Sequence, residues 1–191
     1  MVFDEAFGAW KSAFLSPARF FSSKRAKADF ASGVKWVAAA ATLVAVATWM
    51  STPQFWQWRQ QTPQDFYALL LLILLPVLGF IVASAFVFSV AALMGGKGDF
   101  RRQTYFMGAL SAPLYLSFWA VVWAGSKLAF DYMWLMAVEI VLIVGYSYLT
   151  YEVARAEHRL GRLKSTIVAA VPIILILMVW WPMLLLGSAA D

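Results

Sequence analysis

A run of 29 residues without a charged side chain, Phe66–Met94, constrains the possible folds of this chain more than any other feature. A helix that crosses the hydrocarbon core of a bilayer needs about 20 mostly apolar residues. At 1.5 Å per residue this run would form a helix about 43 Å long. We therefore predict a membrane-spanning helix that tilts, protrudes or kinks near Pro76 and Gly79.

The composition extends this prediction to the whole chain. Of the 191 residues, 63% are hydrophobic and 13% are charged, whereas average soluble domains are about 45–50% apolar and about 25% charged. The apolar runs are continuous rather than alternating, which favours helices over strands. We predict an all-α membrane domain at 34–191 after an N-terminal segment at 1–33, with five transmembrane spans at about 34–50, 66–94, 105–125, 132–151 and 166–187.

Residues that begin and end helices mark some of these boundaries. Pro63 is expected at the first helical position of the second span, where its missing N–H costs nothing. Gly95 and Gly96 are expected to close that span, and Gly161 to end a helical extension of the fourth.

The distribution of basic residues predicts the orientation. Cytoplasmic loops are enriched in Lys and Arg, and only Arg59 and Lys127 fall on the other side of the predicted spans. We therefore expect a multi-pass protein of the cell (inner) membrane, with Met1 in the cytoplasm and Asp191 outside. The basic residues on the cytoplasmic side are Lys11, Arg19, Lys24, Arg25, Lys27, Lys35, Lys97, Arg101, Arg102, Arg155, Arg159, Arg162 and Lys164.

The N-terminal segment carries an aromatic stripe at helical spacing: Phe3, Phe7, Trp10 and Phe14. The pattern predicts an amphipathic helix lying in the cytoplasmic interface, and the alternative is a helix packed against the bundle. Basic residues that follow the stripe favour the interface, because anionic lipid attracts them. These residues are Lys24, Arg25 and Lys27.

The composition also excludes several chemistries. The chain has no cysteine, which excludes disulfides and thiol nucleophiles, and its only histidine is His158. No set of nucleophile, base and orienting group is evident, so we expect no enzyme, no metal site and no cofactor. We expect His158 to be a solvated member of a basic face, and because the positive charge gathers beside a membrane, we expect no nucleic-acid partner.

Two polar segments lie on the predicted cytoplasmic side. Gly95-Gly96-Lys97-Gly98 lacks the spacing of a phosphate-binding loop, so we expect a tight inner turn built on the three glycines. In 152–164, arginines recur at helical spacing. Membrane lipid headgroups are the expected partners of both segments, through Arg101, Arg102, Arg155, Arg159 and Arg162.

Glu139 is the only acidic residue inside a predicted span. An ionisable residue within a membrane is costly and is a functional hypothesis by default, although an interhelical hydrogen bond is an equally good explanation. Tyr132 and Tyr146 share its helical face. Counting inward from the outer boundaries adds Thr42 and Tyr115 as neighbours in a predicted intramembrane polar site.

The third span also carries a stripe of small and polar residues. Small residues let helices approach closely, and hydroxyl groups hydrogen-bond between helices. We expect this stripe to pack against another helix, with a solute path as the alternative. Its members are Thr104, Gly108, Ser111, Tyr115 and Trp119.

Three short motifs make the chain resemble the YIP family, the Ypt/Rab-interacting membrane proteins and their prokaryotic relatives. Ser16–Phe21 resembles the family's P-x-x-F-F pattern before the first span, and Gly95–Phe100 its G-G-x-G-[ST]-F turn. Ala109–Leu114 resembles the proline-bearing start of the third span. Eukaryotic members have a longer N-terminal region and act with Rab GTPases in vesicle traffic. The resemblance implies a bacterial or archaeal member here, without a settled activity.

Two functions from different classes follow. The first is a non-enzymatic scaffold that binds lipids or membrane proteins. The second is a proton- or ion-coupled permease centred on Glu139, working as a parallel homo-oligomer. A water-accessible cavity at Glu139 would favour transport, whereas a hydrogen bond from Glu139 to a neighbouring helix would favour the scaffold.

Overall fold

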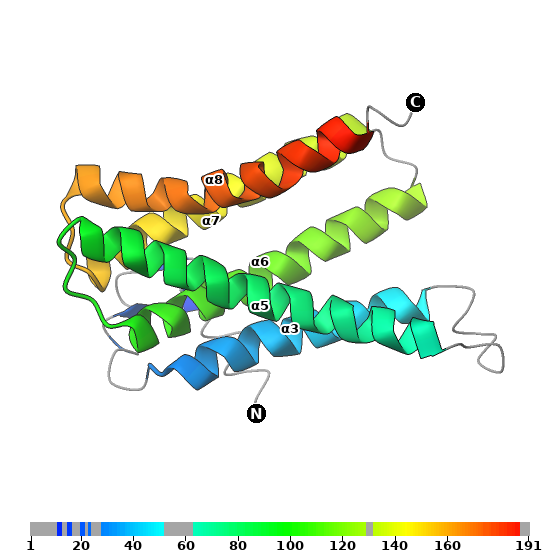
Figure 1. Cartoon of the computed structure of the whole chain (residues 1–191), viewed down its shortest axis with the longest axis horizontal. Helices are drawn as coiled ribbons and strands as arrows, with labels where there is room; N and C mark the ends of the chain where they lie inside the picture. The colour runs from blue at the N-terminus through cyan, green and yellow to red at the C-terminus, as the bar shows by residue number, and fades with distance from the viewer. Residues whose placement is uncertain are drawn as a thin grey trace.

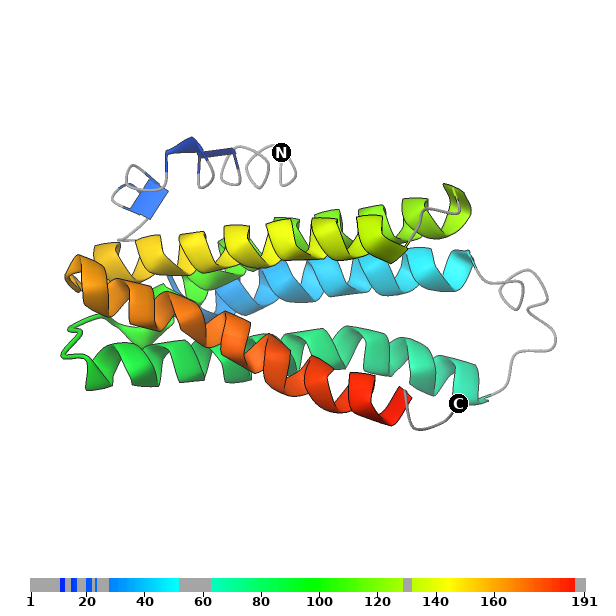
Figure 2. The same ribbon diagram turned by 90° about the horizontal axis from the view of Figure 1, so that it is seen from above.

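Five long helices lie side by side in the computed structural model of the chain (Figures 1 and 2). The part of the chain that the structure describes is all-helical, as predicted. The helices are α3 (Phe30–Met50), α5 (Pro63–Leu93), α6 (Phe100–Leu128), α7 (Tyr132–Ala156) and α8 (Arg162–Gly187).

The structure describes residues 11–12, 15–16, 20–21, 23, 28–51, 63–128 and 132–187. Within the helices, some side chains lie outside this description, namely those of residues 63–65, 126–128, 132–136, 139, 176–177 and 179–187.

Polar caps and proline determine where the first two helices begin. The Asp29 carboxylate accepts a hydrogen bond from the Ser32 backbone N–H at 2.9 Å, which satisfies one of the free N–H groups at the start of α3. Helix α3 therefore begins at Phe30, four residues before the expected start of the first span. Helix α5 begins at Pro63, the expected first helical position.

Left-handed residues follow the ends of α5 and α7. Gly95 has a φ of 86°, and the N–H groups of Gly95 and Gly96 bond back to the carbonyls of Ala92 and Ala91, a pattern that glycine favours. The prediction that Gly161 ends the fourth helix is wrong. Helix α7 already ends at Ala156, and Arg159 adopts a φ of 55° in the turn that follows.

The closest contact between helices joins α3 and α6. Gly33 and Gly108 face one another there, and a Cβ built on Gly108 would overlap the carbonyl group of Gly33. Small buried residues continue this contact along both helices, which lets the backbones stay close. They include Ala40, Ala41 and Ala45 of α3 and Ala109 and Ala112 of α6.

The segment before α3 also contributes to the core. Phe20 and Phe21 are buried, and their ring centroids lie 5.9 and 4.8 Å from that of Phe106 in α6, in edge-to-face arrangements. Such aromatic pairs stabilise a core beyond the area that they bury. The predicted interfacial stripe Phe3, Phe7, Trp10 and Phe14 lies outside the described residues.

The outer faces of the bundle are apolar. Helix α5 exposes a row of leucines and other large apolar side chains, with Leu75 61% exposed and Leu78 55% exposed. In water such a surface would drive association, whereas lipid accommodates it. In the described part of the chain, three helices are long and apolar enough to cross a membrane: α3, α5 and α6 (to Gly125).

The contact between α3 and α6 predicts a stability difference between glycines. Gly108→Ala should lower the free energy of unfolding by about 1–3 kcal/mol, because the added methyl group overlaps the Gly33 backbone. Gly79→Ala is the matched control, since nothing lies within 4 Å of its Cβ position, and it should be neutral or stabilising by about 0.5–1 kcal/mol. Unfolding in detergent micelles measures both. Equal effects would contradict the close contact.

Candidate functional site

Two connections meet at one end of the bundle, which we call the basic end (Figure 1). Here α5 turns into α6, α7 turns into α8, and α3 begins. Basic side chains gather in and beside these connections, and most of them are exposed. They are Lys97, Arg101, Arg102, Arg155, Arg159, Arg162 and Lys164.

The first connection is a glycine turn formed by 94–99. Gly95, Gly96 and Gly98 all lie in it, and it leads into the Asp99 cap of α6. The Asp99 carboxylate accepts hydrogen bonds from the backbone N–H groups of Arg101 at 2.7 Å and Arg102 at 3.3 Å. An acid at this position also complements the helix dipole.

His158, from the second connection, packs into this glycine turn. Its side chain is only 2% exposed, and a Cβ built on Gly98 would lie 2.6 Å from its Nδ1 atom. The prediction of a solvated histidine is therefore wrong. The glycines leave room for the imidazole ring, whose centroid also lies 5.6 Å from that of the Phe88 ring.

A short chain of hydrogen bonds determines the state of this histidine. The Gln103 side-chain amide donates to the Ser84 backbone carbonyl at 2.8 Å, so the Gln103 oxygen faces His158 Nε2 at 2.6 Å. That oxygen only accepts, and Nε2 therefore carries the proton. Nδ1 is buried and has no hydrogen-bond partner among the described residues, and burial lowers the pKa of the imidazole below its ordinary value of 6.5.

Glu157 joins the same connections from the other side. Its buried carboxylate accepts from the Asp99 backbone N–H at 3.1 Å and lies 3.8 Å from the Arg102 guanidinium. Two further bonds cross between the connections: Lys97 N–H to the His158 carbonyl at 3.2 Å, and the Lys164 ammonium to the Met94 carbonyl at 2.7 Å. The connections form one hydrogen-bonded unit, which we call the junction.

The role of the junction is to hold charged side chains in place. Among the described residues, no three His, Cys, Asp or Glu side chains gather as metal ligands would. His158 Nε2 is engaged by Gln103, and the Glu157 carboxylate is engaged by Asp99 and Arg102. What the junction presents outward is its exposed arginines.

The residues predicted to contact lipid headgroups lie in three different environments. Arg102 is paired with Glu157, whereas Arg101 is exposed. Arg155 lies over the Tyr151 ring at 5.7 Å, in the last turn of α7. Because α7 ends at Ala156, Arg159 and Arg162 do not continue its face, although both are exposed. Lys24, Arg25 and Lys27 lie outside the described residues.

The predicted intramembrane polar site is described only in part. The Tyr146 hydroxyl lies 3.2 Å from the Ser111 hydroxyl of α6. Thr42 is exposed, and its hydroxyl donates to the Ala38 carbonyl of its own helix at 2.8 Å. Tyr115 is half-buried. The side chains of Glu139 and Tyr132 lie outside the described residues, so a role for Glu139 stays a prediction.

The polar stripe of α6 meets two different helices. Gly108 touches Gly33 of α3, and Trp119 donates from its indole N–H to the Thr48 hydroxyl of α3 at 2.8 Å. Ser111 instead faces Tyr146 of α7. The stripe therefore packs between helices, which was the favoured expectation.

Sequence reasoning missed Gln103 and Glu157. Neither stands out, because a single amide or acid beside arginines is typical of a solvated helix end. The available signal was Gly96 and Gly98, two closely spaced glycines that indicate a near neighbour in the fold. The two glycines do not indicate which residue lies against them. That residue is His158, which also contacts Gln103, 55 residues earlier in the chain.

The long apolar helices, exposed leucines and connections rich in basic residues indicate a multi-pass helical membrane protein. The sequence model of the Yip1 domain matches residues 11–183. The chain therefore belongs to the Yip1 family, as its three short motifs indicated. No curated protein and no solved structure matched the chain.

The structure gives the motifs physical roles. The two phenylalanines of P-x-x-F-F are the buried Phe20 and Phe21, and the glycines of the turn hold the His158 ring. Asp99 stands where the turn pattern has Ser or Thr. All three residue types cap a helix N-terminus through a side-chain oxygen, so this departure keeps the function of the position.

The buried neutral His158 predicts a pH dependence of stability. The unfolded chain binds the proton near pH 6.5 and the folded chain binds it less readily, so the stabilisation is complete above pH 6.5 and declines below it. The protein should therefore be less stable at pH 5.5 than at pH 7.5. Unfolding in micelles at pH 7.5 and 5.5 measures it. His158→Gln should show a smaller difference between the two pH values, and an unchanged difference would assign the effect to other groups.

Proposed function

We propose that this chain is a non-enzymatic scaffold of the Yip1 family whose basic end binds anionic lipid headgroups and thereby holds membrane proteins, or further copies of itself, at one membrane surface. The observation that carries the proposal is the junction. Two connections are locked together by buried hydrogen bonds, and arginines project from this rigid unit into solvent.

Electrostatics favours lipid as the ligand of this surface. Each Lys or Arg held near an anionic membrane contributes about 1 kcal/mol of attraction. Among the described residues, seven basic side chains are exposed at this end or within two helical turns of it: Lys35, Lys97, Arg101, Arg155, Arg159, Arg162 and Lys164.

The residues of the junction support a structural role over a catalytic one. The single histidine uses Nε2 to hold Gln103, and its Nδ1 is enclosed by glycine backbone rather than open to a substrate. A catalytic base needs to reach the proton that it removes. This arrangement instead suits a structural role, in which the buried contacts hold the turns that carry the exposed basic side chains.

We further propose that all five helices cross the membrane, with the basic end in the cytoplasm and the C-terminus outside. The positive-inside bias supports this orientation, and the polar connections at the basic end suit a membrane surface. In a bacterial cell this would be the inner membrane.

Selective stabilisation by anionic lipid tests the proposed function. Phosphatidylglycerol added to the detergent-solubilised protein should raise its melting temperature more than phosphatidylcholine does. The difference should shrink as salt increases, because salt screens exposed charges. Thermal unfolding across a lipid titration measures both effects.

Arginine variants make this test specific. Arg155→Gln, Arg159→Asn and Arg162→Gln together should remove most of the preference for phosphatidylglycerol. Asn is chosen at 159 because it tolerates the left-handed backbone there. Arg155→Lys with Arg162→Lys keeps the charge and should keep the preference. Equal stabilisation by both lipids, or an unaffected triple variant, would overturn the proposal.

Single cysteines test the proposed topology, because the natural chain has none. Gly161→Cys lies at the basic end with open space at its Cβ position, and Ser51→Cys lies at the opposite end of α3. In intact cells a membrane-impermeant thiol reagent should label position 51 and spare position 161 until the membrane is opened. Labelling of position 161 in intact cells would reverse or refute the topology.

A further inference from the structure

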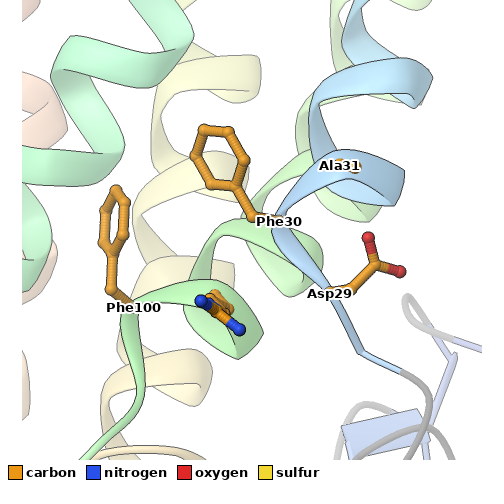
Figure 3. Close-up of a pocket in the computed structure, with 5 residues that line it drawn as sticks. Asp29, Phe30, Ala31 and Phe100 are labelled. Atoms are coloured by element: carbon orange, nitrogen blue, oxygen red, sulfur yellow. The ribbon is translucent and has the colours of Figure 1, made fainter.

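A pocket opens at the basic end where two helices begin together. It has a volume of ≈ 480 Å³ and is lined by Asp29, Phe30, Ala31, Phe100 and Arg101. Phe30 and Phe100 are the first residues of α3 and α6, and their ring centroids lie 5.8 Å apart. Figure 3 shows both rings at the pocket, with the Asp29 carboxylate beside them.

The apolar side of this pocket is well supported. The Phe88 ring of α5 packs edge-to-face on Phe100 at 5.4 Å, so three helices hold the aromatic wall. The pocket lies where the long apolar helices begin, beside the basic connections. In the proposed topology this is the depth at which the glycerol and first methylene groups of a lipid meet its headgroup.

The polar side carries one charge of each sign. Among the described residues, the Arg101 guanidinium has no hydrogen-bond or ion-pair partner, unlike Arg102, which lies near Glu157. The Asp29 carboxylate is held in place by the Ser32 hydroxyl at 2.6 Å and the Ser32 backbone N–H at 2.9 Å. These bonds, and Lys35 to a smaller extent, lower the pKa of Asp29, so the carboxylate is charged at neutral pH.

We propose that this pocket binds a phospholipid whose headgroup carries a primary amine beside its phosphate, as in phosphatidylethanolamine. Arg101 would take the phosphate, Asp29 would accept hydrogen bonds from the ammonium group, and the lipid backbone would lie on the Phe30 and Phe100 rings. This inference rests on the proposed lipid-binding function and deepens it from general anionic attraction to a defined site.

The pair of charges selects among headgroups. A purely anionic headgroup would place its charge near the Asp29 carboxylate without a compensating cation. A choline headgroup carries the positive charge but has no N–H to donate, whereas an ammonium group donates up to three hydrogen bonds. The amine-bearing headgroup is the one that satisfies both charged residues.

Lipid binding to the purified full-length chain tests the site. Binding of phosphatidylethanolamine, phosphatidylcholine and phosphatidylglycerol with identical acyl chains is measured by native mass spectrometry. The wild type should favour the ethanolamine lipid over the choline lipid. Asp29→Asn should weaken only ethanolamine binding, by up to about fivefold, the upper end of the range for an exposed charge pair. Asn caps a helix as well as Asp, so α3 is preserved.

Two further variants separate the roles of the charges. Arg101→Gln should weaken binding of all three lipids, because all three have the phosphate. Glu152→Gln removes a charge from the last turns of α7 without touching the lining of the pocket, and it should leave the headgroup preference unchanged. Equal binding of ethanolamine and choline lipids by the wild type, or an unaltered preference in Asp29→Asn, would overturn the assignment.

The two proposals fail in different ways. If the pocket does not select the amine, the thermal preference for phosphatidylglycerol through Arg155, Arg159 and Arg162 can still hold. If the preference for phosphatidylglycerol is absent while Asp29 still determines ethanolamine selectivity, the proposed binding of anionic lipid at the basic end is wrong. The assignment of the pocket is then still supported.

Discussion

The contact between Gly33 and Gly108 is the interaction on which the arrangement of α3 and α6 depends. Because neither residue has a side chain, the two backbones touch, and the register of the helices is fixed at that point. The register brings the first residues of the helices together, so Phe30 meets Phe100. It also brings Trp36 of α3 against Tyr105 of α6, with ring centroids 5.3 Å apart.

The junction solves a second problem, which is how to hold two helical hairpins together at one end of the bundle. Apolar helices in lipid gain little from burying more apolar surface, so polar contacts and close packing determine which helices associate. Here the contacts are concentrated where α5 turns into α6 and α7 into α8. Buried groups such as Gln103, Glu157 and His158 hold the turns, and most of the arginines remain exposed.

Hydropathy predicted the helices well, because the need for apolar residues in a membrane is a local property of the chain. Proline and glycine marked helix boundaries at Pro63 and Gly95 for equally local reasons. The end of α7 was missed, since Arg159 adopts a left-handed conformation that its residue type does not favour.

The candidate site was harder to predict than the helices. The sequence pattern identified the glycine turn and the exposed arginines, both of which depend on neighbouring residues. It placed His158 in solvent, because its burial depends on Gly96, Gly98 and Gln103, which are distant in the chain. Glu139 was predicted to be functional because an acidic residue is rare within a span. That criterion does not indicate which residue its carboxyl group contacts.

The separation of 55 residues between Gln103 and His158 also has a consequence for biosynthesis. A ribosome that adds about 5–20 residues per second makes His158 roughly 3–11 seconds after Gln103. During that interval the Gln103 side-chain oxygen has to find another partner. Its place in the first turn of α6, beside the polar connections, allows water to serve. A polar group halfway along the apolar helices would have no such substitute, so the end of the bundle is the place where partners so far apart in the chain can wait for one another.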